Sequence, residues 1–204
     1  MRCPSCSNSA LEGSTQCPRC GFSVDKLDRV FGAIPAIAPG LCDHAGLLKA
    51  PEAKKIRVEI GRLEQRFPQL TLSLLTNRLR PQENLNAYAL WIFNKSGICS
   101  QMNQEGANHD ILMMIDAANS GVAMVVGYGL EPFVGEHHLQ PVIEAATPHL
   151  ARGDAYEGCR AAIAELSKML AHICSSLDKT YGIRMSEIFA SETGRADAEN
   201  AAPY

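Results

Sequence analysis

The spacing of hydrophobic residues predicts a helix and then a strand in the first half of the chain. Four apolar side chains recur at intervals of four, three and four residues, as on one side of a helix: Ile56, Ile60, Leu63 and Phe67. Pro51 suits the first turn and Pro68 ends the pattern, so we expect this helix to span 51–67. Residues 70–76 then alternate between apolar and polar, which predicts a strand.

The second half of the chain shows three further helical patterns and two strand-like runs. The helices are predicted over residues 82–95, 136–147 and 154–177. Pro148 is expected to end the second of these, and Asp154 with Glu157 forms a capping-box pattern at the start of the third. The apolar runs 111–115 and 122–126 flank a turn-like segment and predict a β-hairpin or an adjacent strand pair. This order favours an α/β fold, a three-layer α/β/α sandwich around a short mixed sheet.

The composition places the chain among globular proteins. Of its 204 residues, 46% are hydrophobic and 20% are charged, which excludes the disordered and fibrous classes. The formal net charge is −3, and this mild acidity argues against nucleic-acid binding and against attraction to anionic membranes. No signal-peptide pattern opens the sequence, and its longest uncharged apolar stretch, 30–42, is shorter than the roughly 20 residues of a membrane span. We therefore expect a cytoplasmic protein without membrane insertion.

The first 20 residues contain two CxxC pairs, Cys3 with Cys6 and Cys17 with Cys20. Two such turns supply the four thiolates of a tetrahedral metal site, and thiolates favour zinc or iron. The alternatives are a disulfide framework, which needs a secreted context, and a thioredoxin-like redox pair, which needs a βαβ surrounding. Neither context is visible in the sequence, so we expect these four cysteines to bind a structural Zn²⁺.

The segment around these cysteines carries few charges, which are Arg2, Glu12 and Arg19. We therefore expect it to contact a protein rather than a nucleic acid. Its CPxC…CPRCG motif is similar to that of small zinc-ribbon modules at the N-termini of many bacterial proteins. The chain then divides into four parts: a zinc ribbon (1–24), a linker interrupted by Pro and Gly (25–42), an α/β domain (43–183) and a mostly disordered tail (184–204).

The other cysteines, two adjacent histidines and a pair of glycines have less specific interpretations. Small buried apolar roles are expected for the four scattered cysteines, Cys42, Cys99, Cys159 and Cys174. His137 and His138 would point about 100° apart on a helix, so we interpret them as a solvated helix start. Gly127 and Gly129 begin a GxGxxG-like pattern that lacks its third glycine, which excludes a dinucleotide site.

Four stretches of the α/β domain follow one another in a specific order: 41–48 (LCDHAGLL), 88–98 (YALWIFNKSGI), 108–131 and 153–158 (GDAYEG). Together they resemble the TPM-domain family, also called the TPM phosphatase domain, over residues 41–170. This family includes a thylakoid-lumen acid-phosphatase relative. The resemblance implies an α/β/α sandwich with a divalent-cation site, for Ca²⁺ or Mg²⁺, at one end of the sheet.

The resemblance also indicates which residues lie near that cation site. An aspartate before the AGLL stretch corresponds to Asp43, and polar residues before the second strand correspond to Asn108 and His109, next to Asp110. Members of the family usually carry Asp where this chain has Asn108. An amide oxygen binds a hard cation without contributing charge, which weakens both the cation site and a phosphatase activity.

Two further acidic residues and one histidine are candidates on their chemistry alone. Glu131 and Asp116 can add carboxylate oxygens if their loops converge with Asp43, and His44 lies beside Asp43. The alternative for each acidic residue is a helix cap or a turn. Two functions stay open: a zinc-ribbon protein whose TPM-like domain acts in protein binding or regulation, and a divalent-metal-dependent acid phosphatase. Asn108 favours the first.

Overall fold

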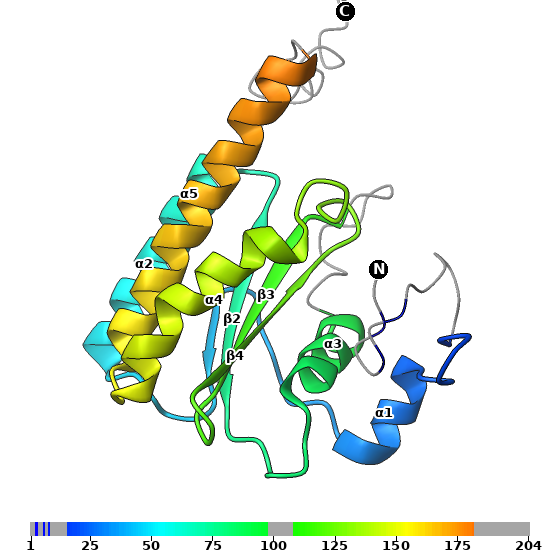
Figure 1. The fold of residues 1–204 in the computed structure, drawn as a ribbon. Coiled ribbons are helices and arrows are strands. Elements are labelled where there is room, and N and C mark those ends of the chain that lie inside the picture. Colours follow the sequence, from blue (N-terminus) through cyan, green and yellow to red (C-terminus); the bar gives the residue numbers. More distant parts are fainter. Residues whose placement is uncertain (1–2, 4–5, 7, 9–15, 98–107, 182–204) are drawn as a thin grey trace, which may run out of the picture. The chain divides into compact units, whose positions relative to one another are not determined.

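The fold is drawn in Figure 1 from a computed structural model that describes residues 3, 6, 8, 16–97 and 108–181. The helices are α1 (Val24–Phe31), α2 (Ala50–Arg66), α3 (Leu85–Lys95), α4 (Glu136–Ala151) and α5 (Ala155–Tyr181). The strands are β1 (Leu41–Asp43), β2 (Thr71–Asn77), β3 (Asp110–Asp116) and β4 (Gly121–Val126). The chain divides into two compact units, Met1–Glu165 and Leu166–Tyr204, so the first unit holds the whole sheet.

The four strands form one mixed sheet in the order β1–β2–β3–β4. Strands β1, β2 and β3 are parallel, and β4 returns antiparallel to β3 as the predicted hairpin. Asp43 pairs with Thr76, and Asp116 pairs with Asn77, so the three parallel strands end side by side. We call this end of the sheet the carboxyl edge. The opposite end, where Asp110 begins β3, is the amino edge.

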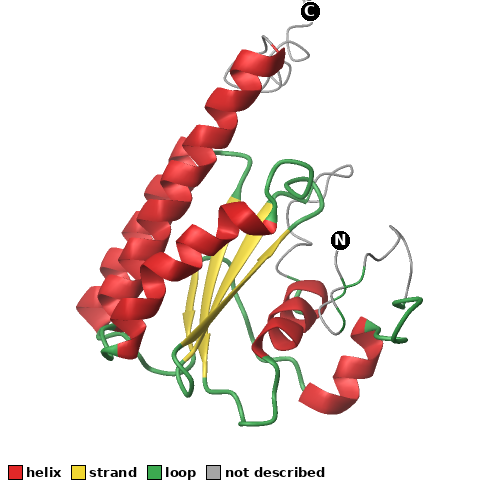
Figure 2. Ribbon diagram, in the orientation of Figure 1, coloured by secondary structure: helices red, strands yellow, loops and turns green. Residues whose placement is uncertain are grey.

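Helices cover both faces of the sheet, which confirms the predicted three-layer sandwich (Figure 2). On one face, Leu75 of β2 and Met114 of β3 pack in one cluster with the buried Trp91 and Ile92 of α3. The residues that alternate with these along each strand, such as the fully buried Leu74, point to the other face. That face is covered by α2 and α4, whose buried residues are Ala53, Ile56, Ile60 and Leu63, and Val142, Ala146 and Leu150.

The predicted helices and strands of the α/β domain are confirmed, with differences at three helix ends, among them the end of α5, which continues to Tyr181 instead of ending at residue 177. Helix α3 begins at Leu85 because the Asn84 side chain accepts a hydrogen bond from the Ala87 N–H (2.9 Å) and caps it. The prediction that Pro148 ends α4 is wrong, since the helix continues to Ala151. Leu150 is buried in this last turn, and tertiary packing of an apolar side chain outweighs the lost hydrogen bond of a proline.

Two elements that the sequence did not predict precede α2. Helix α1 begins at the last residue of the predicted ribbon, Val24, and otherwise lies in the predicted linker; Val24, Leu27 and Phe31 follow one another at intervals of three and four residues. Gly32 ends this helix with a positive φ of 78°, which glycine adopts readily because it has no Cβ. The other element is β1, whose three residues are too few to show a strand pattern. Cys99 and the predicted tail lie outside the described residues.

Among the described residues, no helix combines the length and the hydrophobicity that crossing a membrane requires.

Candidate functional site

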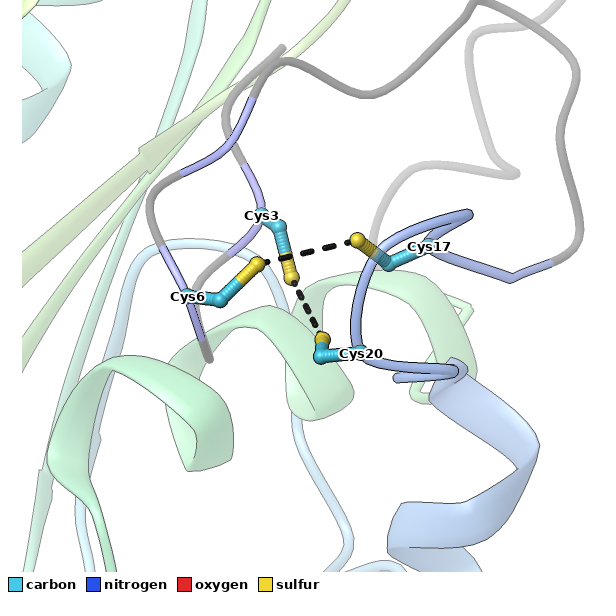
Figure 3. Close-up of side chains that lie close together, drawn as sticks. All are labelled: Cys3, Cys6, Cys17 and Cys20. Carbon is cyan, nitrogen blue, oxygen red and sulfur yellow. Dashed lines mark hydrogen bonds between the residues drawn. The ribbon is translucent and has the colours of Figure 1, made fainter.

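The four N-terminal cysteines lie together, as predicted (Figure 3). Their sulfur atoms all lie within 4.8 Å of one another. The Sγ atoms of Cys3 and Cys20 are 3.6 Å apart, and those of Cys6 and Cys17 are 3.7 Å apart. Sulfurs in a tetrahedral zinc site with Zn–S bonds of about 2.3 Å are roughly 3.8 Å apart. All four are free thiols, so both the donor set and its spacing fit Zn²⁺.

The two cysteine turns are built alike. The Cys3 N–H donates to the Asn8 carbonyl (2.8 Å), and the Cys17 N–H donates to the Phe22 carbonyl (2.7 Å), five residues further on in each case. Gly21, with a φ of 66°, closes the second turn by donating to the Cys17 carbonyl (2.9 Å). Two equivalent turns thus present two sulfurs each to one point, as in zinc-binding knuckles.

Backbone amides around the sulfurs prepare part of this site for thiolates. The backbone N–H of Cys20, followed by that of Arg19, lowers the pKa of Cys17 to about 6. The Phe22 N–H lowers the pKa of Cys20. At Cys6 the Asn8 N–H also acts to lower the pKa, but burial and the neighbouring cysteine sulfurs raise it to about 12. A divalent cation would offset this repulsion among four thiolates.

Asp43, the last residue of β1, organises the loop that follows it. Its Oδ1 accepts hydrogen bonds from the Thr76 hydroxyl and from the Leu47 N–H (3.0 Å). Its Oδ2 accepts from the Leu48 N–H (2.9 Å). His44, the neighbouring candidate, is exposed. Both carboxylate oxygens of Asp43 are therefore engaged by groups of the protein.

Asp116 has the same kind of role at the end of β3. Its side chain is buried, and its Oδ1 accepts from the backbone N–H groups of Leu79 (3.1 Å) and Ala118 (2.9 Å). Its Oδ2 accepts from the Asn119 side chain (2.6 Å). A cavity of about 220 Å³ adjoins it, lined also by Ser120. Asp116 thus has the turn role that the sequence left open for it.

The thiol of Cys159, on α5, is influenced by the charge of Asp43 at the carboxyl edge. It is fully buried, as predicted for a small apolar role, whereas Cys42 and Cys174, for which the same role was predicted, are only partly buried. Burial first, and the negative charge of Asp43 second, raise the pKa of Cys159 to about 12. This thiol is therefore protonated at neutral pH and is a poor nucleophile.

The amino edge gathers the other predicted cation ligands. Asn108 Oδ1 accepts a hydrogen bond from the Asp110 N–H (3.0 Å). The turn that follows β4 lies against these residues, because Gly127 donates to the Asp110 carbonyl (2.8 Å) and Gly129 donates to the Asn108 carbonyl (2.8 Å). Glu131 belongs to the same turn, and its N–H donates to the Gly127 carbonyl (3.2 Å).

The four predicted cation ligands do not meet at one point. Asp43 pairs with Thr76 and Asp110 pairs with Thr71 on the same strand β2. Five residues of strand separate these partners, which is roughly 16 Å. Asp43 thus lies at the carboxyl edge, whereas Asn108, Asp110 and Glu131 lie at the amino edge. Within the described part of the chain, the cysteine cluster is the only group of three or more Cys, His, Asp or Glu side chains placed to hold a metal ion.

The glycine pair and His138 have structural roles. A Cβ atom at Gly129 would lie 2.6 Å from His109 Cδ2, so close packing explains the glycine without a nucleotide. The rings of His137 and His138 do not point apart as expected, since their centroids are 3.8 Å apart. The ring of His138 is held because its Nδ1 accepts the Gly135 N–H (3.1 Å) at the start of α4.

Sequence reasoning missed Thr76 and Asn119, the side-chain partners of Asp43 and Asp116. Thr76 is a polar residue at the buried end of an apolar strand, which is a signal that sequence reasoning could have used. Asn119 lies three residues after Asp116, within reach of an aspartate at the start of a turn.

Residues 41–169 match the model of the TPM domain family, and the chain belongs to this family. Its fold is similar to the N-terminal domain of a protein from P. gingivalis at 19% identity (TM-score 0.54; 71% of this chain and 85% of that one). It is also similar to the BA42 protein of Bizionia argentinensis at 15% identity (TM-score 0.52; 62% and 83%). A third similar structure is the N-terminal domain of the cg2496 protein of Corynebacterium glutamicum, at 12% identity (TM-score 0.50; 64% and 78%). No curated protein matches the chain.

Proposed function

We propose that this chain is a cytoplasmic zinc-binding protein whose TPM domain acts in protein binding or regulation. The observation that carries the proposal is the convergence of the sulfur atoms of Cys3, Cys6, Cys17 and Cys20. Four thiolates favour Zn²⁺ over the hard cations Ca²⁺ and Mg²⁺, which prefer oxygen ligands. All four sites of a tetrahedral ion are filled by the protein, so the zinc has a structural role and no open position for catalysis.

The acidic residues of the carboxyl edge have structural roles of their own. Metal-dependent hydrolysis needs carboxylate oxygens that hold a cation and an activated water. The oxygens of Asp43 and Asp116 instead accept hydrogen bonds from backbone and side-chain donors of the protein itself. Through those bonds the two carboxylates act as turn-forming groups, which is sufficient reason for aspartate at these positions without a hydrolytic role.

The turn after β4 supplies a surface suited to a protein partner. Tyr128 and Phe133 are exposed on this turn, at 57% and 42% of their full accessibility. Gly127 and Gly129 hold the turn against Asn108 and His109 through close contacts. Rigid exposed aromatic side chains are enriched in protein–protein interfaces, because they bury a large area with little loss of conformational entropy.

The first test measures metal and hydrolysis with the full-length chain. We expect about one zinc per chain by mass spectrometry. We also expect no turnover of p-nitrophenyl phosphate in the presence of Ca²⁺ or Mg²⁺. Turnover that disappears in Asp43→Asn would replace this proposal by the phosphatase function.

The second test addresses protein binding with matched surface variants. Wild type, Tyr128→Ala and Val58→Ala serve as baits in the same cell extract. Val58 is also exposed, at 46%, but lies on α2. A protein retained by wild type and by Val58→Ala, and lost with Tyr128→Ala or after zinc removal, supports the proposal. If every retained protein is the same for all baits with and without zinc, the binding role is wrong.

A further inference from the structure

Helix α1 lies outside the part of the chain that matches the TPM domain, yet it completes the packing of that domain. Its Leu27 is buried in the cluster that contains Trp91 and Tyr88 of α3. The Phe31 ring meets the Tyr88 ring edge-on, with centroids 4.9 Å apart, and lies 5.3 Å from the Trp91 ring. Trp91 has no exposed surface, so a chain without docked α1 would expose an aromatic face of α3.

Polar contacts fix the register of α1 on α3. The Trp91 Nε1–H donates to Asp28 Oδ1 at 2.7 Å. Lys95 Nζ lies 2.6 Å from Asp25 Oδ1 and 3.3 Å from Asp28 Oδ2. These bonds need α1 to be helical, because Asp25 and Asp28 must face the same side one turn apart. Through the bond to Asp28, Trp91 is in direct contact with α1.

The cysteine turns lead directly into α1. Phe22 accepts a hydrogen bond from the Cys17 N–H and also packs against the same apolar cluster as Leu27. Lys26, in the first turn of α1, donates from Nζ to the Gly21 carbonyl at 2.6 Å. The turn that positions Cys17 and Cys20 is therefore bonded to the residues that begin and anchor the helix.

Neither part has enough internal stability to form alone. An isolated helix of eight residues is shorter than the roughly 12–15 residues at which helices become marginally stable in water. A ribbon with few apolar residues depends on its metal to fold. Groups that order the same segment stabilise each other, and this coupling is reciprocal.

We propose that zinc binding at the four cysteines and docking of α1 on α3 are coupled, so that loss of zinc releases α1 and uncovers the Trp91 face of the TPM domain. This inference rests on the proposed zinc centre and adds that zinc binding there regulates the TPM domain. Zinc would thus control which surface the TPM domain presents to a partner.

Trp91 provides the readout, because it is the one tryptophan of the sequence. We expect a chelator to shift the Trp91 emission to longer wavelength and to increase its quenching by acrylamide, and added zinc to reverse both changes. Far-ultraviolet circular dichroism on the same samples establishes that the α/β domain stays folded. If one zinc binds per chain and Trp91 emission is the same with and without it, the coupling is wrong although the zinc centre stands. If no zinc binds, the proposed centre itself fails, and the two failures are therefore distinguishable.

Reciprocity gives the second measurement. Phe31→Leu and Asp28→Ala leave all four cysteines intact but weaken the contact of α1 with α3, so we expect each to lower zinc affinity by about tenfold. Arg29→Ala is the matched control, because Arg29 is an exposed residue of the same helix. Zinc affinities that are equal in all three variants and in wild type would overturn the inference.

Discussion

The cysteine cluster and the carboxyl edge of the sheet both gather ligand-type side chains, but they use them in opposite ways. The four sulfurs point at one another from two separate turns and lie within 4.8 Å of one another. At the carboxyl edge, Asp43 and Asp116 accept hydrogen bonds from the loops that follow their strands. In the cysteine cluster the side-chain atoms face a common point between them, where a metal ion can bind. In an acidic turn the backbone N–H groups face the carboxylate of one residue.

The largest effect is expected at the cysteine cluster. Cys17→Ser removes one thiolate, and because structural zinc contributes on the order of 10 kcal/mol to the folding of finger peptides, the loss of a ligand should release the metal. Zinc content by mass spectrometry after gel filtration measures this. Cys42→Ser is the control, since Cys42 lies outside the cluster. A Cys17→Ser protein that keeps one zinc at the wild-type affinity would contradict the ligand assignment.

The next effect is expected at the carboxyl edge. Asp116→Ala leaves two backbone N–H groups and the Asn119 amide without their acceptor in a buried place, so we expect a loss of about 3 kcal/mol in the free energy of unfolding. Denaturant unfolding measures this loss. Asp154→Ala removes one exposed cap to the Glu157 N–H and should cost about 1 kcal/mol. Equal losses in the two variants would show that Asp116 does not hold the turn.

A third effect separates glycines that are required from one that is not. At Gly127 a Cβ would overlap the side chain and carbonyl of Asn108, so Gly127→Ala should lower the free energy of unfolding by about 2 kcal/mol. Gly61 lies within α2, where a Cβ would meet open space, so Gly61→Ala should raise the free energy of unfolding by about 0.5–1 kcal/mol. Thermal unfolding of the two variants checks the opposite signs. A Gly127→Ala protein that is as stable as wild type would show that the turn after β4 accommodates an added methyl group.

The smallest effect is a pH dependence at α1. The hydrogen bond from Trp91, together with Lys95, holds the pKa of Asp28 below its ordinary value of 3.8. The Asp28 carboxylate therefore stabilises docking above that value, and this contribution is lost as the pH falls through the lowered pKa. We expect Trp91 emission to begin to shift only below a pH of about 4, and this pH-dependent part to be absent in Asp28→Asn. An identical acid profile for wild type and Asp28→Asn would exclude Asp28 as the titrating group.

Periodicity predicted the elements that carry many buried residues and missed those that carry few. Helix α2, with four buried side chains at regular intervals, is as expected, and so is the hairpin of β3 and β4. Helix α1 was missed because its eight residues stand among prolines and glycines and bury only Leu27. The predicted end of α4 was wrong because a proline is a local signal, whereas Leu150 is held by distant residues.

The sequence by itself determined the cysteine site and the family of the domain. Two CxxC turns predict a metal site specifically, because the position of the two sulfurs in each turn depends only on the few residues of that turn. The sequence could not decide in the same way whether the residues of the cation site implied by the family resemblance come together. These residues lie far apart in the sequence, and only strand direction and register decide which edge each one reaches.

Tertiary structure alone decided that Asp43 stands at one edge while Asn108, Asp110 and Glu131 stand at the other. It also decided that α1 covers Trp91. Both results depend on contacts between residues that are distant in the chain, and such contacts are chosen by the packing of the whole core rather than by any local pattern.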